Sequence, residues 1–376
     1  MICYLSYVAI YVARLNLSMA APALKDLHVL TTEQVGLLGS IFSIVYACGR
    51  LVSGVFSDRI APWKMICTGL TLSGIANLVF GVLPPFAAMA LLWGVNAVAQ
   101  SLIWGSLMRN ISVLYPEHLA KKRASQMGTA VAAGNLVGIL VNSRLIEGLG
   151  VQWAFLIPGG ITLLFTLLVM LLCHGVNPPP SPRKNADFFR LLGNNELRHV
   201  LAPAFLHGII KDNISLWMAV YVVDQFGKDL ASSAYYMLLI PAVGLAGRLL
   251  VPTLYSLCKN RETTLMALSF AANIAVCLLL VFFPVNALFA VCCLSLIYLL
   301  TSVINTCLLA LYPMRFAAEN AVASAAGILD FFSYLGNGAG AAVFGIFIAR
   351  WGYWSMFAAW AGASLLALLL LCNRQK

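Results

Sequence analysis

The sequence predicts an all-α membrane protein in which twelve transmembrane helices form two pseudo-symmetric six-helix bundles. Three observations support this fold class. The chain of 376 residues is 61% hydrophobic and only 10% charged, whereas about a quarter of the residues in a soluble domain are charged. Apolar stretches of bilayer-spanning length recur along the whole chain. Short motifs of the first half also return in the second half at nearly constant spacing.

The apolar stretches are long enough to cross a bilayer as helices, for which about 20 residues are needed. The loops between them are short, so the chain has no room for a separate soluble domain. In chain order, the twelve predicted spans are 1–24, 34–57, 65–84, 86–114, 124–146, 152–175, 199–224, 231–257, 263–284, 286–312, 320–348 and 351–372.

The basic residues predict how the chain crosses the membrane. The net charge of +10 would by itself also suit nucleic acid as a partner, but its distribution argues against that. With a cytoplasmic N-terminus, fourteen basic residues fall on the cytoplasmic side and three on the other side, which is the positive-inside pattern. We therefore expect a monomer in the plasma (inner) membrane, surrounded by lipid, with both termini cytoplasmic and no nucleic-acid partner.

The remaining basic residues lie within the spans or at their ends, where a charge is expensive and usually lines a cavity. These six are Arg14, Arg50, Arg109, Arg144, Lys211 and Arg248. The ten cysteines lie mostly inside spans and lack metal-type spacing, so we expect them to be packing residues rather than metal ligands. Nothing in the sequence resembles a Walker loop or a nucleophile triad, and we expect no cofactor and no enzymatic activity.

A Pro-rich polar segment separates the sixth span from the seventh and is typical of a linker. We expect an N-terminal six-helix bundle over 1–175, a cytoplasmic linker over 176–198 and a C-terminal six-helix bundle over 199–376.

Two motifs occur once in each of these halves, in the same order. Gly49-Arg50-Leu51 returns as Gly247-Arg248-Leu249 at an offset of 198, and Gly134-Asn135 returns as Gly336-Asn337 at an offset of 202. Together they favour an internal duplication. Parallel six-helix repeats with a substrate site between them near the membrane midplane describe the major facilitator architecture.

The duplication relates Arg14 in the first span to Lys211 in the seventh, because an offset of 198 leads from Arg14 to position 212. In a pseudo-twofold structure, two such basic residues can face each other across a central cavity and bind one anion. The alternatives are that Arg14 binds backbone carbonyl groups and that Lys211 pairs with an acid, either Asp330 in the eleventh span or its neighbour Asp212.

Motifs in four helices then resemble those of a known family. In the first helix, one helical face carries Tyr7, Tyr11, Arg14 and Ser18, and Asn16 and Met19-Ala20-Ala21-Pro22 belong to the same motif. The fourth helix has an Asn-x3-Gln-x3-Trp-x4-Arg spacing, made by Asn96, Gln100, Trp104 and Arg109. In the seventh helix Trp217 follows Lys211 by six residues, and in the eleventh Tyr334 precedes Leu335-Gly336. The chain resembles the organophosphate:inorganic phosphate antiporters, the group of the glycerol-3-phosphate and hexose-phosphate transporters.

This resemblance implies roles for individual residues. The residues that it places in the substrate site are Arg14, Lys211, Tyr7, Tyr11, Asn96, Gln100, Trp104 and Tyr334. The segment 54–62 resembles the loop signature of the superfamily and implies that Asp58 and Arg59 act with Arg109 as a gate on the cytoplasmic side.

The chain also departs from the family pattern. Lys211 replaces an arginine, Val113 replaces a histidine, and Asp330 stands where the glycerol-phosphate members have a small residue. Lysine is a point charge without the bidentate fork of arginine, so an organic anion other than a phosphate stays open as the substrate. Asp330 can either neutralise Lys211 or take up the proton of a proton-coupled mechanism.

We therefore expect a secondary transporter of an organic anion, in the first place a phosphorylated metabolite exchanged for inorganic phosphate by rocker-switch alternating access. One alternative is proton-coupled symport of a sugar acid, because the related anion:cation symporters also carry an Arg-x-Asn-Leu-Ser first helix like that at 14–18. Another is a transporter-like membrane sensor of a phosphorylated metabolite.

Overall fold

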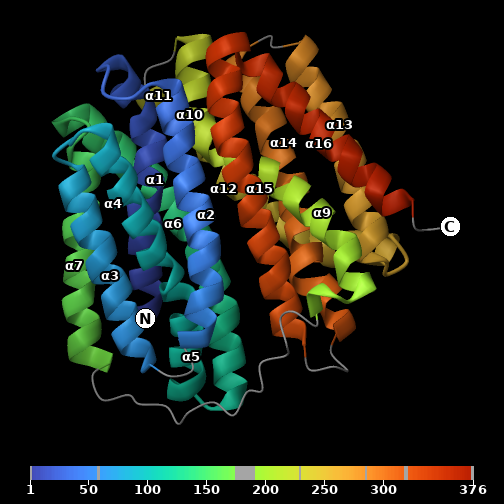
Figure 1. Cartoon of the computed structure of the whole chain (residues 1–376), viewed down its shortest axis with the longest axis horizontal. Coiled ribbons are helices and arrows are strands. Elements are labelled where there is room, and N and C mark those ends of the chain that lie inside the picture. Colours follow the sequence, from blue (N-terminus) through green and yellow to red (C-terminus); the bar gives the residue numbers. More distant parts are fainter. Residues whose placement is uncertain are drawn as a thin grey trace. The chain divides into compact units, whose positions relative to one another are not determined.

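The computed structural model describes residues 2–56, 60–173, 191–227, 230–283, 286–316 and 321–373. These residues form helices joined by short loops (Figure 1). Among the described residues, eleven helical segments are long and apolar enough to cross a membrane. The prediction of an all-α multi-pass membrane protein is confirmed.

The first six predicted spans are all helical. Their helices are α1 (Ile2–Asp26), α2 (Thr32–Phe56), α3 (Pro62–Phe80), α4 (Phe86–Ser101), α5 (Ile103–Leu114), α6 (Glu117–Leu149) and α7 (Trp153–Cys173). α4 and α5 together make the fourth span, with a turn at Leu102 between them. α3 starts with Pro62 in its first turn, where a missing N–H costs nothing and the fixed φ of proline suits the helix.

The second half contains the remaining helices. They are α9 (Asn195–Lys211), α10 (Asn213–Phe226), α11 (Leu230–Met237), α12 (Leu239–Leu257), α13 (Glu262–Phe282), α14 (Ala287–Thr306), α15 (Val322–Trp351) and α16 (Tyr353–Cys372). α14 continues through a π-helical segment, η1 (Cys307–Leu311), into a 3₁₀ turn, η2 (Tyr312–Phe316).

The seventh predicted span, 199–224, is not the continuous helix that we expected. It consists of α9 and α10, which are separated by a turn at Asp212. The Asn213 side chain donates from Nδ2 to the carbonyl oxygen of Ile209 at 3.0 Å. In an uninterrupted helix this oxygen would accept the backbone N–H of residue 213. The side chain thus takes over a helical acceptor at the point where the helix is interrupted.

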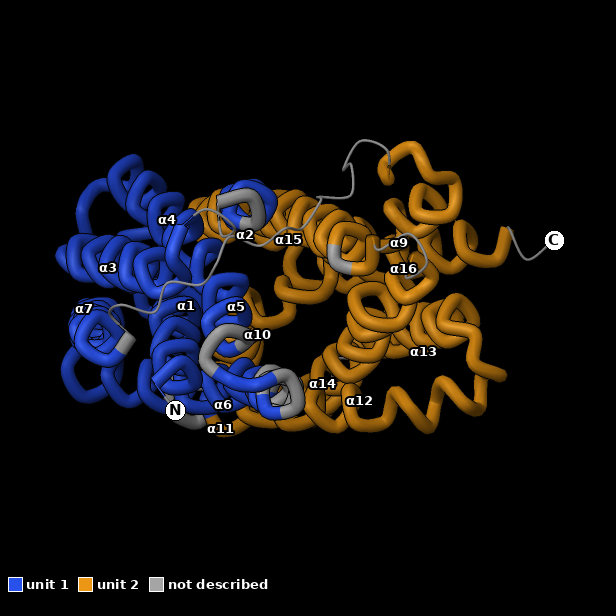
Figure 2. Tube along the Cα trace, turned by 90° about the horizontal axis from the view of Figure 1, so that it is seen from below, with its two compact units in different colours: residues 1–31, 45–182, 229–234 blue, residues 32–44, 183–228, 235–376 orange. Residues whose placement is uncertain are grey.

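The helices form two compact units, which Figure 2 shows in different colours. Unit 1 comprises Met1–Thr31, Val45–Pro182 and Asp229–Ala234, and unit 2 comprises Thr32–Ile44, Arg183–Lys228 and Tyr235–Lys376. α2 therefore contributes its first half to unit 2 and its second half to unit 1. Most of the predicted linker lies outside the described residues, and the predicted boundaries at 175 and 199 stay a prediction.

The packing within each unit repeats, as an internal duplication requires. In unit 1, α1 packs along α6 and α7, while α3 packs on α7 and α4. In unit 2, α9 packs along α15 and α16, while α13 packs on α16 and α14. The first, third, fourth, fifth and sixth spans of each half therefore make corresponding contacts.

The glycines of the repeated motifs lie at these helix contacts. A Cβ atom on Gly134 would lie 2.5 Å from a side-chain atom of α1, and one on Gly336 would overlap a backbone carbonyl of α9. Gly49 and Gly247 in turn approach α4 and α14 too closely for a side chain. Small residues allow membrane helices to approach at backbone distance, so the repeated glycines are packing residues.

Candidate substrate-binding site

Two arginines of unit 1 converge on one aromatic ring. The guanidinium of Arg14, on α1, lies 5.5 Å from the ring centre of Tyr11 and 4.5 Å from that of Tyr46 on α2. Arg50, one turn after Tyr46, lies 6.0 Å from the same ring. Each cation is attracted by the ring quadrupole, so Tyr46 holds two permanent positive charges close together.

Aromatic side chains extend this cluster along α1. The ring of Tyr7 lies 5.2 Å from that of Tyr11 and 4.8 Å from that of Trp104 on α5. Tyr7 is buried, while Tyr11, Arg14 and Trp104 are half-buried. The structure thus brings together four residues that the family resemblance places in the substrate site, although their binding role stays a prediction.

Asn96 and Gln100 belong to a buried polar network that connects three helices. Asn96 Oδ1 accepts hydrogen bonds from Ser73 Oγ at 2.6 Å and from Gln100 Nε2 at 3.1 Å. On α3, Asn77 donates to the Ser73 carbonyl at 2.8 Å and accepts from Asn16 of α1 at 2.6 Å. Both predicted site residues are at most 2% exposed. In this structure they join α1, α3 and α4, and their contact with a substrate stays a prediction.

Lys211 lies at the end of α9 in unit 2, directly before the interruption of the seventh span. Its Nζ atom is 3.6 Å from Asp212 Oδ2 and 4.7 Å from the ring centre of Tyr334 on α15. The Lys211 side chain is 14% exposed and that of Asp212 is 38% exposed, so the ion pair is partly open to a ligand. Asp330 lies half-buried one turn before Tyr334, and its role stays a prediction.

Comparison with known proteins places the chain in a family. Residues 3–341 match the family model described as "Major Facilitator Superfamily". The chain belongs to the major facilitator superfamily.

The glycerol-3-phosphate transporter of Bacillus subtilis is 23% identical over 98% of this chain and 89% of its own length. The phosphoglycerate transporter protein of Salmonella typhimurium is 24% identical over 98% of this chain and 86% of its own length. The membrane sensor protein UhpC of the same organism is 24% identical over 99% of this chain and 90% of its own length.

Solved structures share the fold of this major facilitator protein. The nucleoside transporter NupG superposes with a TM-score of 0.78 at 14% identity, over 99% of this chain and 97% of that one. A bacterial homolog of the lysosomal transporter Spinster gives a TM-score of 0.77 at 16% identity, over 99% of this chain and 94% of that one. The relatives bear names from the group that the first and fourth helices resemble, which confirms that resemblance. Membership of a transporter superfamily also agrees with the prediction that the protein is no enzyme.

The predicted gate of this major facilitator protein is described only in part. Asp58 and Arg59 lie outside the described residues. Arg109, on α5, donates from Nη1 to the carbonyl oxygen of Ile60 at 3.3 Å. This bond ties the end of the fourth span to the residues just before α3, close in sequence to Asp58.

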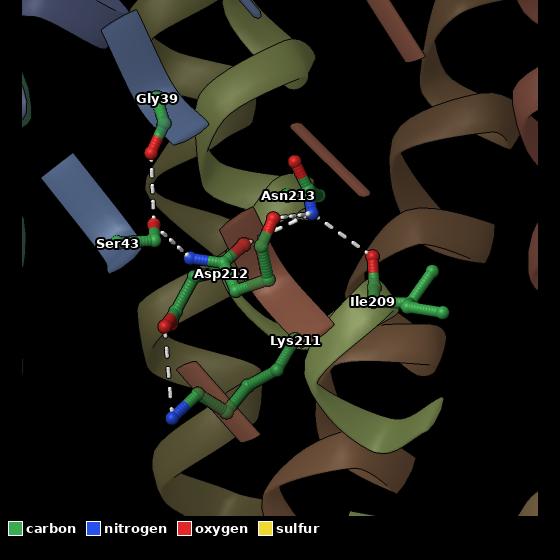
Figure 3. A network of polar contacts seen from close by, with 7 residues as sticks. Gly39, Ser43, Ile209, Lys211, Asp212 and Asn213 are labelled. Carbon is green, nitrogen blue, oxygen red and sulfur yellow. Dashed lines mark hydrogen bonds and ion pairs between the residues drawn. The ribbon is translucent and has the colours of Figure 1, made fainter. Parts of the chain in front are cut away.

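Three polar residues that the sequence did not assign to the site connect to the interruption at Asp212. Asn213 Nδ2 donates to Asn337 Oδ1 at 2.9 Å, and Asn337 Nδ2 donates to Ser43 Oγ at 2.7 Å (Figure 3). The recurrence of Asn337 after Gly336 was a sequence signal, but it left open whether the amide binds substrate or another helix. The sequence also contained a signal for Arg50 as a site residue, because Arg50 is a basic residue within a span, four residues after Tyr46.

Proposed function

We propose that this major facilitator protein is a secondary transporter that exchanges a phosphorylated metabolite for inorganic phosphate by alternating access. The observation that carries this proposal is the pair of guanidinium groups, Arg14 and Arg50, at the ring of Tyr46. A phosphate monoester carries about −1.5 to −2 charges at pH 7 and three strong acceptor oxygens. The guanidinium fork donates two parallel hydrogen bonds to such a group, so the cluster suits phosphate in charge and in geometry.

We infer that Lys211 of the second half also binds the anion. Lys211 adds a positive charge without a fixed geometry, and Tyr334 keeps its Nζ atom at the ring face. When the anion leaves, the like charges of Arg14 and Arg50 remain close together in a membrane segment, where charge is expensive. A bound anion therefore stabilises the conformations through which the carrier must pass. This favours exchange of one anion for another over the return of an empty carrier.

Two further properties belong to this proposal. The relatives include transporters whose names specify glycerol-3-phosphate and phosphoglycerate, which supports a phosphorylated metabolite as the substrate class. The basic residues of the loops support a location in the inner membrane with both termini in the cytoplasm. We take the transporting unit to be a monomer, since one chain carries both Arg14 and Lys211, the residues that we expect to bind the anion.

Counterflow in proteoliposomes tests the exchange. Vesicles that contain the purified protein are loaded with phosphate or left without it, and the uptake of labelled phosphate is measured with and without a pH gradient. We expect uptake only into phosphate-loaded vesicles and no requirement for the gradient. Arg14→Ala should abolish this uptake, whereas Arg144→Ala, which removes an exposed arginine of α6, should leave it intact. Normal transport by Arg14→Ala would contradict the proposed site.

The same assay separates exchange from proton symport. If uptake needs an inward proton gradient and no internal phosphate, and if Asp330→Asn abolishes it, the protein is a symporter and Asp330 takes up the coupled proton.

A sensor is the second candidate, because one relative that covers 99% of the chain is named a membrane sensor protein. A sensor needs to bind the anion but does not need to move it. Thermal stabilisation of the purified protein by phosphate or a sugar phosphate, together with no counterflow, would favour the sensor. Counterflow at a rate that depends on Arg14 would favour the transporter.

A further inference from the structure

The first half of α2 is attached to unit 2 by very close packing with α15. Added Cβ atoms on Gly36 and Gly338 would lie 2.5 Å from Ala341 O and 2.6 Å from Ile44 Cγ1 respectively. A Cβ on Gly345 would lie 3.1 Å from the carbonyl oxygen of Thr32. Residues 32–44 therefore rest on α15 at backbone distance, although the second half of the same helix belongs to unit 1.

One chain of side-chain hydrogen bonds crosses this contact. Asn337 of α15 donates to Ser43 Oγ at 2.7 Å, and Ser43 donates to the Gly39 carbonyl at 2.9 Å (Figure 3). Asn337 is 7% exposed and Ser43 is 3% exposed. Buried polar groups are costly to leave without partners, so α2 is held in one register on α15 as long as this bond exists.

The other end of this series of hydrogen bonds is Asn213, two residues after Lys211, the proposed anion-binding residue. Asn213 is fully buried and directly follows the Lys211–Asp212 pair at the interruption of the seventh span. Its Nδ2 atom lies within hydrogen-bond distance of Ile209 O at 3.0 Å, Asn337 O at 3.1 Å and Asn337 Oδ1 at 2.9 Å. The two N–H bonds of the Asn213 amide are thus shared among three acceptor oxygens on α9 and α15. A movement of the turn at Asp212 changes the distances from this amide to the three oxygens.

We propose that Asn213, Asn337 and Ser43 are positioning residues that couple the occupancy of Lys211 to the packing of α2 on α15. The inference rests on the proposed function in one respect, namely that an anion binds Lys211. An anion competes with Asp212 for the ammonium group and moves the turn between α9 and α10. Asn213 then loses its optimal geometry toward Asn337, and Asn337 holds Ser43 less firmly. Residues 32–44 are released from α15 as a consequence.

Hydrogen exchange of the full chain in nanodiscs tests this coupling. Without ligand, Asn337→Ala should speed amide exchange of peptides within 32–44 about fivefold, the factor that corresponds to one lost buried hydrogen bond. Asn135→Ala is the matched control, because Asn135 is the repeat equivalent of Asn337 but lies on α6 of unit 1, away from the contact of residues 32–44 with α15. It should leave 32–44 unchanged. Unchanged exchange of 32–44 in Asn337→Ala would overturn the inference.

Inorganic phosphate separates this inference from the proposed function. Saturating phosphate should speed the exchange of 32–44 in the wild type but add nothing in Asn337→Ala, even though phosphate still raises the melting temperature of that variant. An equal response of both proteins would overturn the coupling. A wild type whose melting temperature does not respond to phosphate would instead contradict the proposed substrate.

Transport kinetics add a readout that a purely structural role would not give. Asn337→Ala should lower the maximal rate of phosphate exchange about fivefold and leave the half-saturating concentration unchanged. Ser43→Ala should act in the same direction, and the double variant should be no slower than Asn337→Ala, because both changes remove the same bond. Multiplied effects in the double variant, or a change confined to the half-saturating concentration, would contradict the proposal.

Discussion

Tyr46 is the side chain that brings two positive charges of unit 1 together. Its ring lies 4.5 Å from the Arg14 guanidinium and 6.0 Å from that of Arg50. Each contact contributes roughly 0.5–1 kcal/mol where water has access and more where it does not. The ring thus offsets part of the repulsion between the arginines in the absence of a ligand. A bound phosphate would offset the rest.

At this scale the first prediction concerns Arg50. Arg50→Gln keeps most of the length and polarity of the side chain but removes its charge, so we expect the half-saturating phosphate concentration to rise about tenfold, the effect of one lost charge-assisted hydrogen bond. Counterflow measures this value. Arg248→Gln is the matched control, because Arg248 occupies the equivalent place in the repeated tripeptide. Equal effects of the two changes would argue against a special role for Arg50.

A second prediction concerns the lysine that replaces the family arginine. Lys211→Arg supplies a bidentate fork, so the half-saturating phosphate concentration should fall about fivefold, as for one added hydrogen bond. Lys211→Ala should lose most of the exchange. If Lys211→Arg instead weakened phosphate binding and strengthened that of a carboxylate, the substrate would be a different organic anion.

The residues of the site also show how far sequence alone could go. Arg14, Tyr11 and Tyr7 share one face of α1, and helical spacing is enough to predict that they lie together. The contact of Arg14 with Tyr46 depends on how α2 packs on α1, which spacing within one helix does not determine. For the same reason, the sequence offered two acids for Lys211 but could not show that Asp212 forms the ion pair of 3.6 Å.

At the scale of the helices, hydrophobicity and length predicted where the spans lie but not where they are interrupted. The seventh span divides at Asp212, where the Asn213 side chain binds Ile209 and Asn337. The second of these contacts joins positions 124 residues apart in the chain. The repeated glycines were better signals, because backbone contact between helices requires the smallest residue wherever it occurs.

The third prediction concerns one of these glycines. A Cβ on Gly336 would overlap a backbone carbonyl of α9, and backbone has no alternative rotamer to adopt. Gly336→Ala should therefore destabilise the protein by about 1–3 kcal/mol, the usual cost of overpacking. Gly327→Ala on the same helix is the control, since an added Cβ there meets no described atom within 4 Å apart from its chain neighbours and its own helix backbone. Melting of the purified variants measures the difference, and similar melting temperatures would contradict it.

At the scale of the whole molecule, the duplication gives each half the same packing but different chemistry. α1 carries an arginine within an unbroken helix, whereas its counterpart carries a lysine at an interruption. Arginine keeps its charge in any surroundings, while lysine is a mobile point charge. The arginine of the first half is therefore suited to holding an anion in a fixed geometry, and the lysine of the second half to adjusting its position.

The last prediction concerns the orientation of the chain in the membrane. The twelve predicted spans would place both termini on one side, and the excess of basic residues in alternate loops predicts that this side is the cytoplasm. A fluorescent protein fused after Lys376 should therefore fluoresce, and alkaline phosphatase at the same point should stay inactive, because that enzyme matures only outside the cytoplasm. The same phosphatase fused within the loop between α1 and α2, at residues 27–31, should be active. An active phosphatase at the C-terminus would mean an odd number of crossings or an inverted chain. With an odd number, the segment that fails to cross would be the interrupted seventh span, α9 with α10. Neither of these helices alone has the length of about 20 residues that a crossing takes.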